Sequence, residues 1–148
     1  MKRDNGAPCI SQQSTGMAYS ILAEIGQMLN ALSEHGESGG IDLRSLPMTD
    51  TDREQLQDML GHGEVRVEMD LAGASEIWET SYPGVWWIRH KGAGDRISTE
   101  EIAITPAPEI LFSHPADIAK AAARIQRELD STGMQSLEHE HEPEVRNV

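Results

Sequence analysis

The sequence has little of the chemistry that marks an enzyme, a disulfide-linked secreted domain or a membrane protein. Its 148 residues include a single cysteine, so no disulfide can form within the chain. No apolar run approaches the roughly 20 residues of a membrane-spanning helix. The opening residues MKRDNGAPCISQQ are charged but lack the apolar stretch of a signal peptide. We therefore expect a soluble, cytoplasmic protein without membrane insertion.

Basic residues are also scarce. The chain has 12 Lys and Arg against 25 Asp and Glu, a formal net charge of −13. Such an excess of negative charge opposes binding to nucleic acid, which depends on neutralising phosphates. We predict no nucleic-acid partner. The acidity either keeps a solvated surface soluble or attracts a basic protein partner.

Motifs that hold catalytic groups at fixed spacing are absent too. The sequence has no G-x-S-x-G, H-E-x-x-H or P-loop motif, and Cys9 lies in a polar segment. We predict a binding module that is not an enzyme, without a cofactor or a resident metal. The alternative, a metal or cluster carrier, would have to use scattered histidines, which are His62, His90, His114, His139 and His141.

Aromatic residues make up only 4% of the chain, and most of them lie in one stretch. Ser75–His90, SEIWETSYPGVWWIRH, contains all three tryptophans. Pro83 and Gly84 suit the central positions of a type II turn, in which glycine takes a positive φ. Strand-forming residues flank this turn on both sides. The stretch therefore predicts a β-hairpin whose connection is longer than two residues.

The second strand of this hairpin places Trp86 on one face and Trp87 on the other. We predict that one of them is buried and that the other is partly exposed and contacts a partner. Glu79, Arg89 and His90 are candidates for a polar rim around an apolar centre, and Arg89 is also a candidate to pair across the hairpin with Glu79 or Glu76; the two interpretations are compatible. The candidate partner-binding residues are Trp78, Glu79, Tyr82, Pro83, Gly84, Trp86, Trp87 and Arg89.

Hydrophobic periodicity predicts three helices, over residues 14–36, 49–61 and 113–133. Each predicted segment is preceded by residues whose side chains can cap a helix, and each ends at a glycine. The expected caps are Ser14 or Thr15, Thr49 or Thr51, and Ser113 or His114.

The clearest strand is Glu64–Leu71, EVRVEMDL, which alternates between polar and apolar residues. We expect Val65, Val67, Met69 and Leu71 to point inward and the charged residues to face water. One wet face excludes a doubly wound α/β fold. Further strands are expected near Ile41 and over Ile97–Thr105. The fold class is therefore α+β: a mainly antiparallel meander with three helices, the first and last packed on one face.

The ends of the chain differ from its centre in composition. Residues 1–13 and 134–148 hold no periodic apolar set and are predicted to be disordered. Residues 14–133 are predicted to form a single domain, as the length suggests. We expect both ends to be removable with little loss of stability.

Several separated motifs resemble one known family. They are IDLRSLPMT, LGHGEVRVEM, SEIWETSYPGVWWIRH, EIAITPAPEIL and HPADIAKAAARI, and they follow one another in that order. From about Ile21 to Leu129 the chain resembles the C-terminal conserved region of hydrogenase expression proteins of the HupH/HyaF type. Many members of that family carry additional sequence before this region.

The resemblance implies an accessory protein for the maturation of [NiFe] uptake hydrogenases. Such a protein is thought to act as a chaperone or assembly scaffold for a hydrogenase subunit, in this case the precursor of the iron–sulfur small subunit. The expected partners are this precursor and other maturation proteins. A metal or cluster carrier in the same maturation pathway is the alternative.

Overall fold

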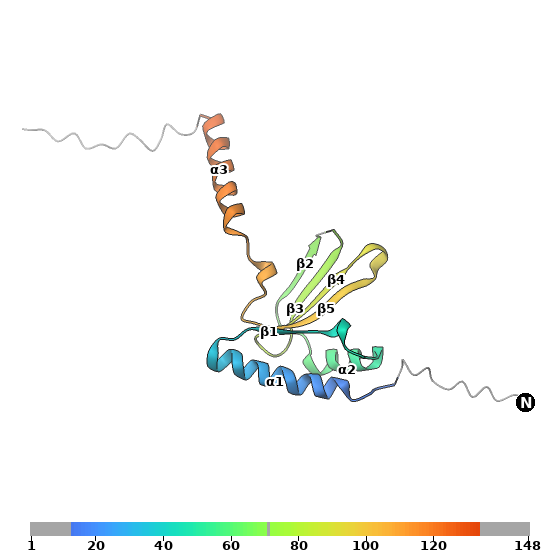
Figure 1. Cartoon of the computed structure of the whole chain (residues 1–148). Coiled ribbons are helices and arrows are strands. Elements are labelled where there is room, and N and C mark those ends of the chain that lie inside the picture. Colours follow the sequence, from blue (N-terminus) through green and yellow to red (C-terminus); the bar gives the residue numbers. More distant parts are fainter. Residues whose placement is uncertain (1–12, 71, 134–148) are drawn as a thin grey trace, which may run out of the picture. The chain divides into compact units, whose positions relative to one another are not determined.

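The structure is a computed structural model that describes residues 13–70 and 72–133 (Figure 1). Within these ranges it holds three α-helices and one antiparallel sheet of five strands in the order β1-β5-β4-β3-β2. The strands are β1 (Gly39–Asp42), β2 (Arg66–Asp70), β3 (Ala74–Glu79), β4 (Val85–Lys91) and β5 (Ile97–Ile104). The helices are α1 (Met17–His35), α2 (Asp50–Leu60) and α3 (Pro115–Ser131). The predicted α+β class and antiparallel meander are confirmed.

The chain divides into two compact units between Pro108 and Glu109. The first unit contains α1, α2 and the sheet, and the second contains α3, preceded by the 3₁₀ helix η4 (Glu109–Leu111). Of the helices in the described ranges, none is long and apolar enough to cross a membrane. The predicted disordered ends lie almost wholly outside the described residues. The single domain over residues 14–133 stays a prediction.

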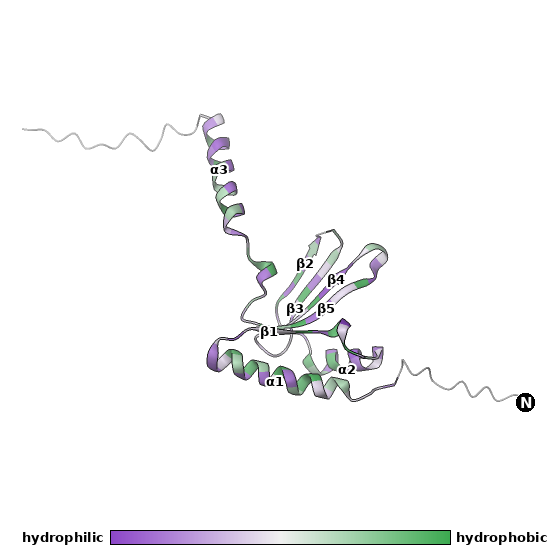
Figure 2. Cartoon of the chain, viewed as in Figure 1, coloured by the Kyte–Doolittle hydropathy of each residue, from purple (hydrophilic) through white to green (hydrophobic). Residues whose placement is uncertain are grey.

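The second unit is dominated by α3, which starts where the sequence predicts. His114 caps it, with Nδ1 accepting a hydrogen bond from the backbone N–H of Ala116 at 3.1 Å. Hydrophobic and hydrophilic residues alternate along the helix (Figure 2), and the large apolar side chains Ile118, Ile125 and Leu129 are exposed. The predicted packing of this helix on the sheet, beside the first helix, stays a prediction.

The long helix α1 buries one stripe and ends at a glycine. Ala18, Ile21 and Ile25, three and four residues apart, are buried. Gly36 follows the last turn with φ 68°, and its N–H donates to the Leu32 carbonyl at 2.9 Å. A residue with a Cβ would be strained at this φ, so glycine is the residue that closes the helix.

The starts of α1 and α2 are joined through one carboxylate. Asp52 forms a capping box with Thr49: each residue's backbone N–H donates to the other's side chain, at 3.1 Å in both cases. The Asp52 carboxylate also accepts from Thr15 N and Oγ1, both at 2.7 Å. Burial raises the pKa of Asp52, but these hydrogen bonds together lower it to about 2. The predicted Thr49 cap is confirmed.

The predicted cap of α1 is wrong. Gly16 occupies the N-cap position and makes no side-chain hydrogen bond there. Thr15 is engaged with Asp52 of α2 instead, and Ser14 Oγ donates to Gln55 Oε1 at 3.0 Å. Thr15 Oγ1 also accepts from the Met17 N–H at 3.4 Å, so a local contact at the start of α1 is present beside the contacts between the two helices.

The main hydrophobic core lies between one face of the sheet and the helices α1 and α2, which run beside each other along that face (Figure 1). Its buried members are Ala18, Ile21, Ile25, Ile41, Leu43, Leu56, Leu60, Trp78, Val85, Trp87, Ile102 and Ile104. Because side chains alternate along a strand, the neighbours of these residues occupy the other face of the sheet. There Ile77, Trp86 and Ile88 are buried as well. We call these two surfaces the helix-side face and the opposite face.

The strand β2 alternates as predicted, although its apolar side lies away from α1 and α2. Its pairing with β3 places Val67 and Met69 on the opposite face, where both are half-buried. Val65 is 41% exposed, so its predicted inward position is wrong. It precedes the first residue of an outer strand, which has a neighbouring strand on one side only. Leu71 lies outside the described residues.

Candidate functional site

The predicted hairpin is formed by β3 and β4, and its turn has the expected geometry. The Val85 N–H donates to the Tyr82 carbonyl at 3.0 Å, and Gly84 has φ 88°. The prediction of a type II turn with positive φ at Gly84 is confirmed. The turn also lies close to α1, since a Cβ added at Gly84 would stand 3.4 Å from Leu29 Cδ2. The positive φ therefore favours glycine here, whereas a Cβ would make only an ordinary van der Waals contact with Leu29.

All three tryptophans of the hairpin are buried. The exposed fraction is 7% for Trp78, 5% for Trp86 and 0% for Trp87. The prediction that Trp86 or Trp87 is partly exposed is therefore wrong. The indole N–H groups of Trp86 and Trp87 have acceptors inside the fold: Trp86 donates to the Thr105 carbonyl at 3.1 Å, and Trp87 donates to Glu100 Oε2 at 3.2 Å. Both faces of β4 are covered, so neither indole is free for a partner.

Glu100 on β5 is a fully buried carboxylate held by two arginines. Arg89 Nε of β4 donates to Oε2 at 2.7 Å, and Arg53 Nε of α2 lies 2.5 Å from Oε1. Glu100 was not among the site residues predicted from the sequence. A signal was present, because Glu100 stands two residues before Ile102 and four before Ile104, on the buried face of the strand. A charge at such a position needs partners, and α2 and β4 supply them.

Trp78 is the centre of an aromatic and cationic stack. Its ring lies parallel to that of Trp87, with 5.6 Å between centroids and 7° between planes. The ring of His62 stands 5.5 Å away, tilted by 37°. The Arg89 guanidinium carbon lies 5.2 Å from the Trp78 ring centroid, a cation–π distance. We call Arg53, His62, Trp78, Trp87, Arg89 and Glu100 the Trp78 cluster.

The outer edge of this cluster is charged. Glu76 on β3 lies 3.7 Å from each of Arg66, Arg89 and Lys91. The predicted pairing of Arg89 across the hairpin is therefore confirmed, with Glu76 as the partner. Glu79 is excluded from this role because it is three positions further along β3 and so lies on the opposite face.

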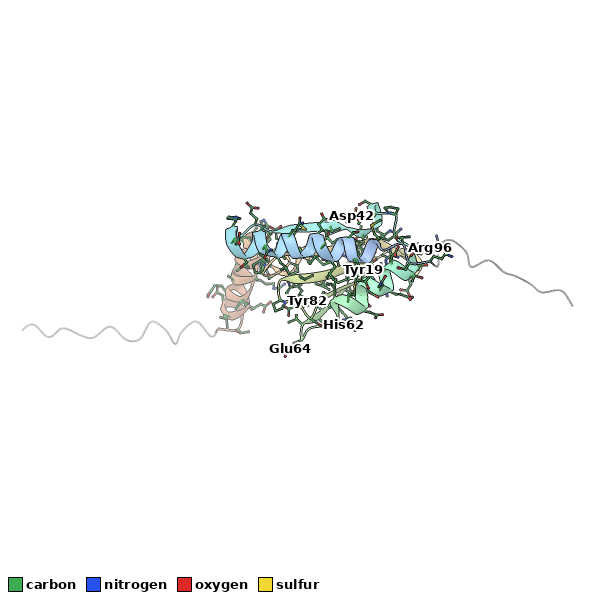
Figure 3. All side chains as sticks on the ribbon, turned by 90° about the horizontal axis from the view of Figure 1, so that it is seen from below. Tyr19, Asp42, His62, Glu64, Tyr82 and Arg96 are labelled. Carbon is green, nitrogen blue, oxygen red and sulfur yellow. The ribbon has the colours of Figure 1, made fainter. Side chains whose placement is uncertain are left out.

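The remaining predicted partner-binding residues lie at the turn. Tyr82 is 47% exposed and Pro83 is also exposed, whereas Glu79 and Gly84 are half-buried. Figure 3 labels Tyr82 together with Tyr19 of α1, which is 61% exposed. The hairpin thus has a buried tryptophan frame and a small accessible tip.

Each of the described histidines that were considered as metal ligands makes a different structural contact. His62 stacks on Trp78, His90 Nδ1 lies 2.7 Å from Ser75 Oγ, and His114 caps α3. Among residues 13–70 and 72–133, no three His, Cys, Asp or Glu side chains are grouped to hold a metal ion. The histidines of the C-terminal tail lie outside the described residues.

The fold and the cluster define an α+β domain with two helices on one face of a sheet and an aromatic, charged centre. The family described as the HupH hydrogenase expression protein, C-terminal conserved region, matches residues 16–132, and the chain belongs to this family. The match extends from the start of α1 to the end of α3, so it includes every element that builds the Trp78 cluster.

Curated relatives have related names. The chain is 27% identical over 105 residues to the hydrogenase expression/formation protein HoxQ of Azotobacter vinelandii, covering 68% of this chain and 37% of that protein. It is 30% identical over 96 residues to the hydrogenase expression/formation protein HupH of Rhodobacter capsulatus, covering 65% and 35%. For the hydrogenase-1 operon protein HyaF of Escherichia coli K12, the identity is 29% over 109 residues, with coverage of 74% and 36%. The chain thus spans a little over a third of the length of these relatives.

A solved structure has a similar fold. The hydrogenase expression protein HupH from Thiobacillus denitrificans ATCC 25259 is 43% identical to this chain and superimposes with a TM-score of 0.75. The alignment covers 80% of this chain and 99% of that one. The chain is therefore similar over nearly its whole described length to a structure that corresponds to this region alone.

Proposed function

We propose that this chain takes part in the maturation of a [NiFe] uptake hydrogenase, as an accessory protein that binds a hydrogenase subunit during assembly. One observation carries the proposal: the family match over residues 16–132, in which the curated relatives are named hydrogenase expression/formation proteins. The chain acts as a chaperone or scaffold for the precursor of the iron–sulfur small subunit and catalyses no reaction itself.

The hairpin tip is the proposed contact surface. Tyrosine is enriched among the residues that dominate binding energy, and Tyr82 is the large exposed side chain of the tip. The tip is held in one conformation by the turn hydrogen bond at Val85 and by the approach of Gly84 to Leu29 of α1. A surface that is already ordered loses less conformational entropy on binding. The buried Trp86 and Trp87 support this surface and do not contact the subunit.

The net charge of −13 supports a partner with a basic surface. Complementary charge speeds association and disfavours wrong partners more than it strengthens binding. Association with the subunit should therefore slow as salt concentration rises, since salt screens exposed charges.

Co-purification tests this function. The tagged full-length chain is isolated from cells grown on hydrogen, and bound polypeptides are identified by mass spectrometry. We expect the small-subunit precursor in the captured fraction. Capture of no hydrogenase subunit, or of the large subunit alone, would contradict the proposal. Stoichiometric metal in the purified chain would favour the carrier alternative.

A further inference from the structure

A pocket of about 240 Å³ opens beside the Trp78 cluster. It lies on the helix-side face, where α2 ends and β2 and β3 continue beyond it. Its walls come from five consecutive parts of the first unit: α2, the turn after it, and the strands β2, β3 and β4. The lining residues are Gln57, His62, Arg66, Glu76, Trp78 and Arg89. His62 is labelled at this position in Figure 3.

The pocket carries positive charge in a strongly acidic protein. Two guanidinium groups and one carboxylate line it. The formal charge of these lining residues is +1, whereas the whole chain carries −13. A guanidinium offers five N–H donors and no acceptor. An anion that enters the pocket therefore meets the N–H donors of Arg66 and Arg89.

The donors of these arginines are only partly used. Arg89 commits its Nε to Glu100, while its Nη1 lies 3.7 Å from Glu76. Arg66 Nη2 lies 3.1 Å from Glu68 and 3.7 Å from Glu76. A separation of 3.7 Å is longer than a hydrogen bond between nitrogen and oxygen. Both guanidinium groups thus keep N–H donors for a second carboxylate that enters between them.

The cationic groups of the pocket are held in place from behind. Arg89 is fixed by the buried carboxylate of Glu100 and by its contact with the ring of Trp78. Trp78 is in turn stacked on Trp87. A donor that is already oriented needs little reorganisation when a ligand arrives. The edge of Trp78 and the ring of His62 add an apolar wall against which a short carbon chain or ring can pack.

We propose that this pocket binds a carboxylate carried on a short apolar or aromatic group, as the C-terminus of a peptide segment with an apolar or aromatic last residue presents it. Arg66 and Arg89 bind the carboxylate, and Trp78 and His62 contact the group that bears it. The inference deepens the proposed function and rests on it in assigning the carboxylate to a partner protein.

Three small probes of the same shape and different charge test the chemistry. Phenylacetate, phenylacetamide and phenethylamine are titrated into the ¹⁵N-labelled full chain at constant ionic strength, and the indole N–H signals are followed by NMR. Trp86→Phe and Trp87→Phe spectra identify the Trp78 signal by elimination. We expect saturable shifts of Trp78 with phenylacetate, about tenfold weaker binding of the amide, and no binding of the amine. Equal or tighter binding of the amine or of inorganic phosphate would overturn the proposal.

A pair of arginine variants tests the position. Arg66→Gln should weaken phenylacetate binding about fivefold, because Arg66 is largely exposed and its contribution is screened by solvent. Arg96→Gln removes the same charge from an exposed position outside the pocket and should leave the affinity unchanged. Equal affinities for the two variants would contradict the assignment.

The probes contain no hydrogenase subunit, so the two proposals fail separately. If phenylacetate does not bind, the proposed carboxylate site is wrong, but the proposed binding of the subunit by the hairpin tip is not affected. Absence of the subunit after co-purification removes the proposed function, while phenylacetate binding would still establish the site.

Discussion

Trp86 and Trp87 are consecutive on β4, yet the two faces bury them in different ways. Trp87 looks toward α1 and α2, stacks on Trp78 and donates its N–H to the carboxylate of Glu100. Trp86 looks toward the opposite face and donates to the backbone carbonyl of Thr105. One indole therefore depends on a side chain from another strand, and the other depends on the backbone.

The difference shows on which face of the sheet a substitution destabilises the fold most. On the helix-side face, a buried charge is balanced only because α2 brings Arg53 and β4 brings Arg89 to the same carboxylate of β5. Removing the carboxylate leaves both arginines without their shared partner, so that Arg53 keeps only Asp50 and Arg89 keeps only Glu76 as ion-pair partners. On the opposite face, Trp86 has Glu79 and Ala103 as cross-strand neighbours and gives its N–H to a backbone carbonyl, so a substitution there costs mainly its own contacts.

Removing the buried carboxylate should affect the helix-side face most. Glu100→Ala leaves Arg53 and Arg89 without their shared partner, so we expect the free energy of unfolding to fall by about 3–5 kcal/mol. Urea denaturation measures the loss. Glu101→Ala, exposed on the opposite face of the same strand, should change it by less than about 0.5 kcal/mol. Similar losses for the two variants would remove the distinction between the faces.

Exchanging each tryptophan for phenylalanine compares the two acceptors directly. Trp87→Phe takes a donor from the buried carboxylate of Glu100, and we expect a loss of about 2–3 kcal/mol. Trp86→Phe takes a donor from a carbonyl, and we expect about 1 kcal/mol. Thermal and urea melts give both values. A larger loss for Trp86→Phe would reverse the comparison.

Acid should weaken the helix layer that covers Trp87. The folded pKa of Asp52, about 2, lies below the ordinary value of 3.8. Its stabilisation is therefore complete above about pH 4 and is lost as the pH falls from there toward 2, for a total of roughly 2 kcal/mol. Asp52→Asn should show this loss at pH 7 and a flatter dependence on pH between 4 and 2. Asp58→Asn, exposed on the same helix, is the control and should keep the wild-type curve.

The turn at Gly84 sets the register of both faces, and its substitution should have the smallest effect on stability. Gly84→Ala places a Cβ at φ 88°, which we expect to cost about 1 kcal/mol. Gly26→Ala, in the middle of α1 with open space around it, should instead stabilise the chain by about 0.5–1 kcal/mol. If urea denaturation shows a loss of stability for Gly84→Ala and a gain for Gly26→Ala, backbone conformation decides the effect of both substitutions. A loss at Gly26 would contradict this account.

The features that depend on neighbouring residues were predictable from the sequence. The Pro83–Gly84 turn, the alternation of β2, the start of α3 and the α+β class follow from local turn chemistry and periodicity, and all are found in the structure. The family resemblance stated from the motifs is also confirmed by the match over residues 16–132.

The features that depend on distant residues were missed. The burial of both Trp86 and Trp87 requires cover on two faces, which the pattern of a single strand does not contain. Thr15 was assigned to a helix cap, but its partner is Asp52, 37 positions away. His62 was named only among the histidines of the metal-carrier alternative, and its contact with Trp78 arises only when α2 is placed on the sheet. Tertiary packing decided each of these positions.

The central claim is that the hairpin tip binds a hydrogenase subunit while the tryptophans beneath it support the fold. The direct test is the affinity of the purified small-subunit precursor for three immobilised chains: wild type, Tyr82→Ala and Tyr19→Ala. Both tyrosines are exposed, and only Tyr82 belongs to the tip. We predict that Tyr82→Ala weakens binding by about 2 kcal/mol, roughly thirtyfold, and that Tyr19→Ala binds like wild type. Equal affinities for all three chains would contradict the claim.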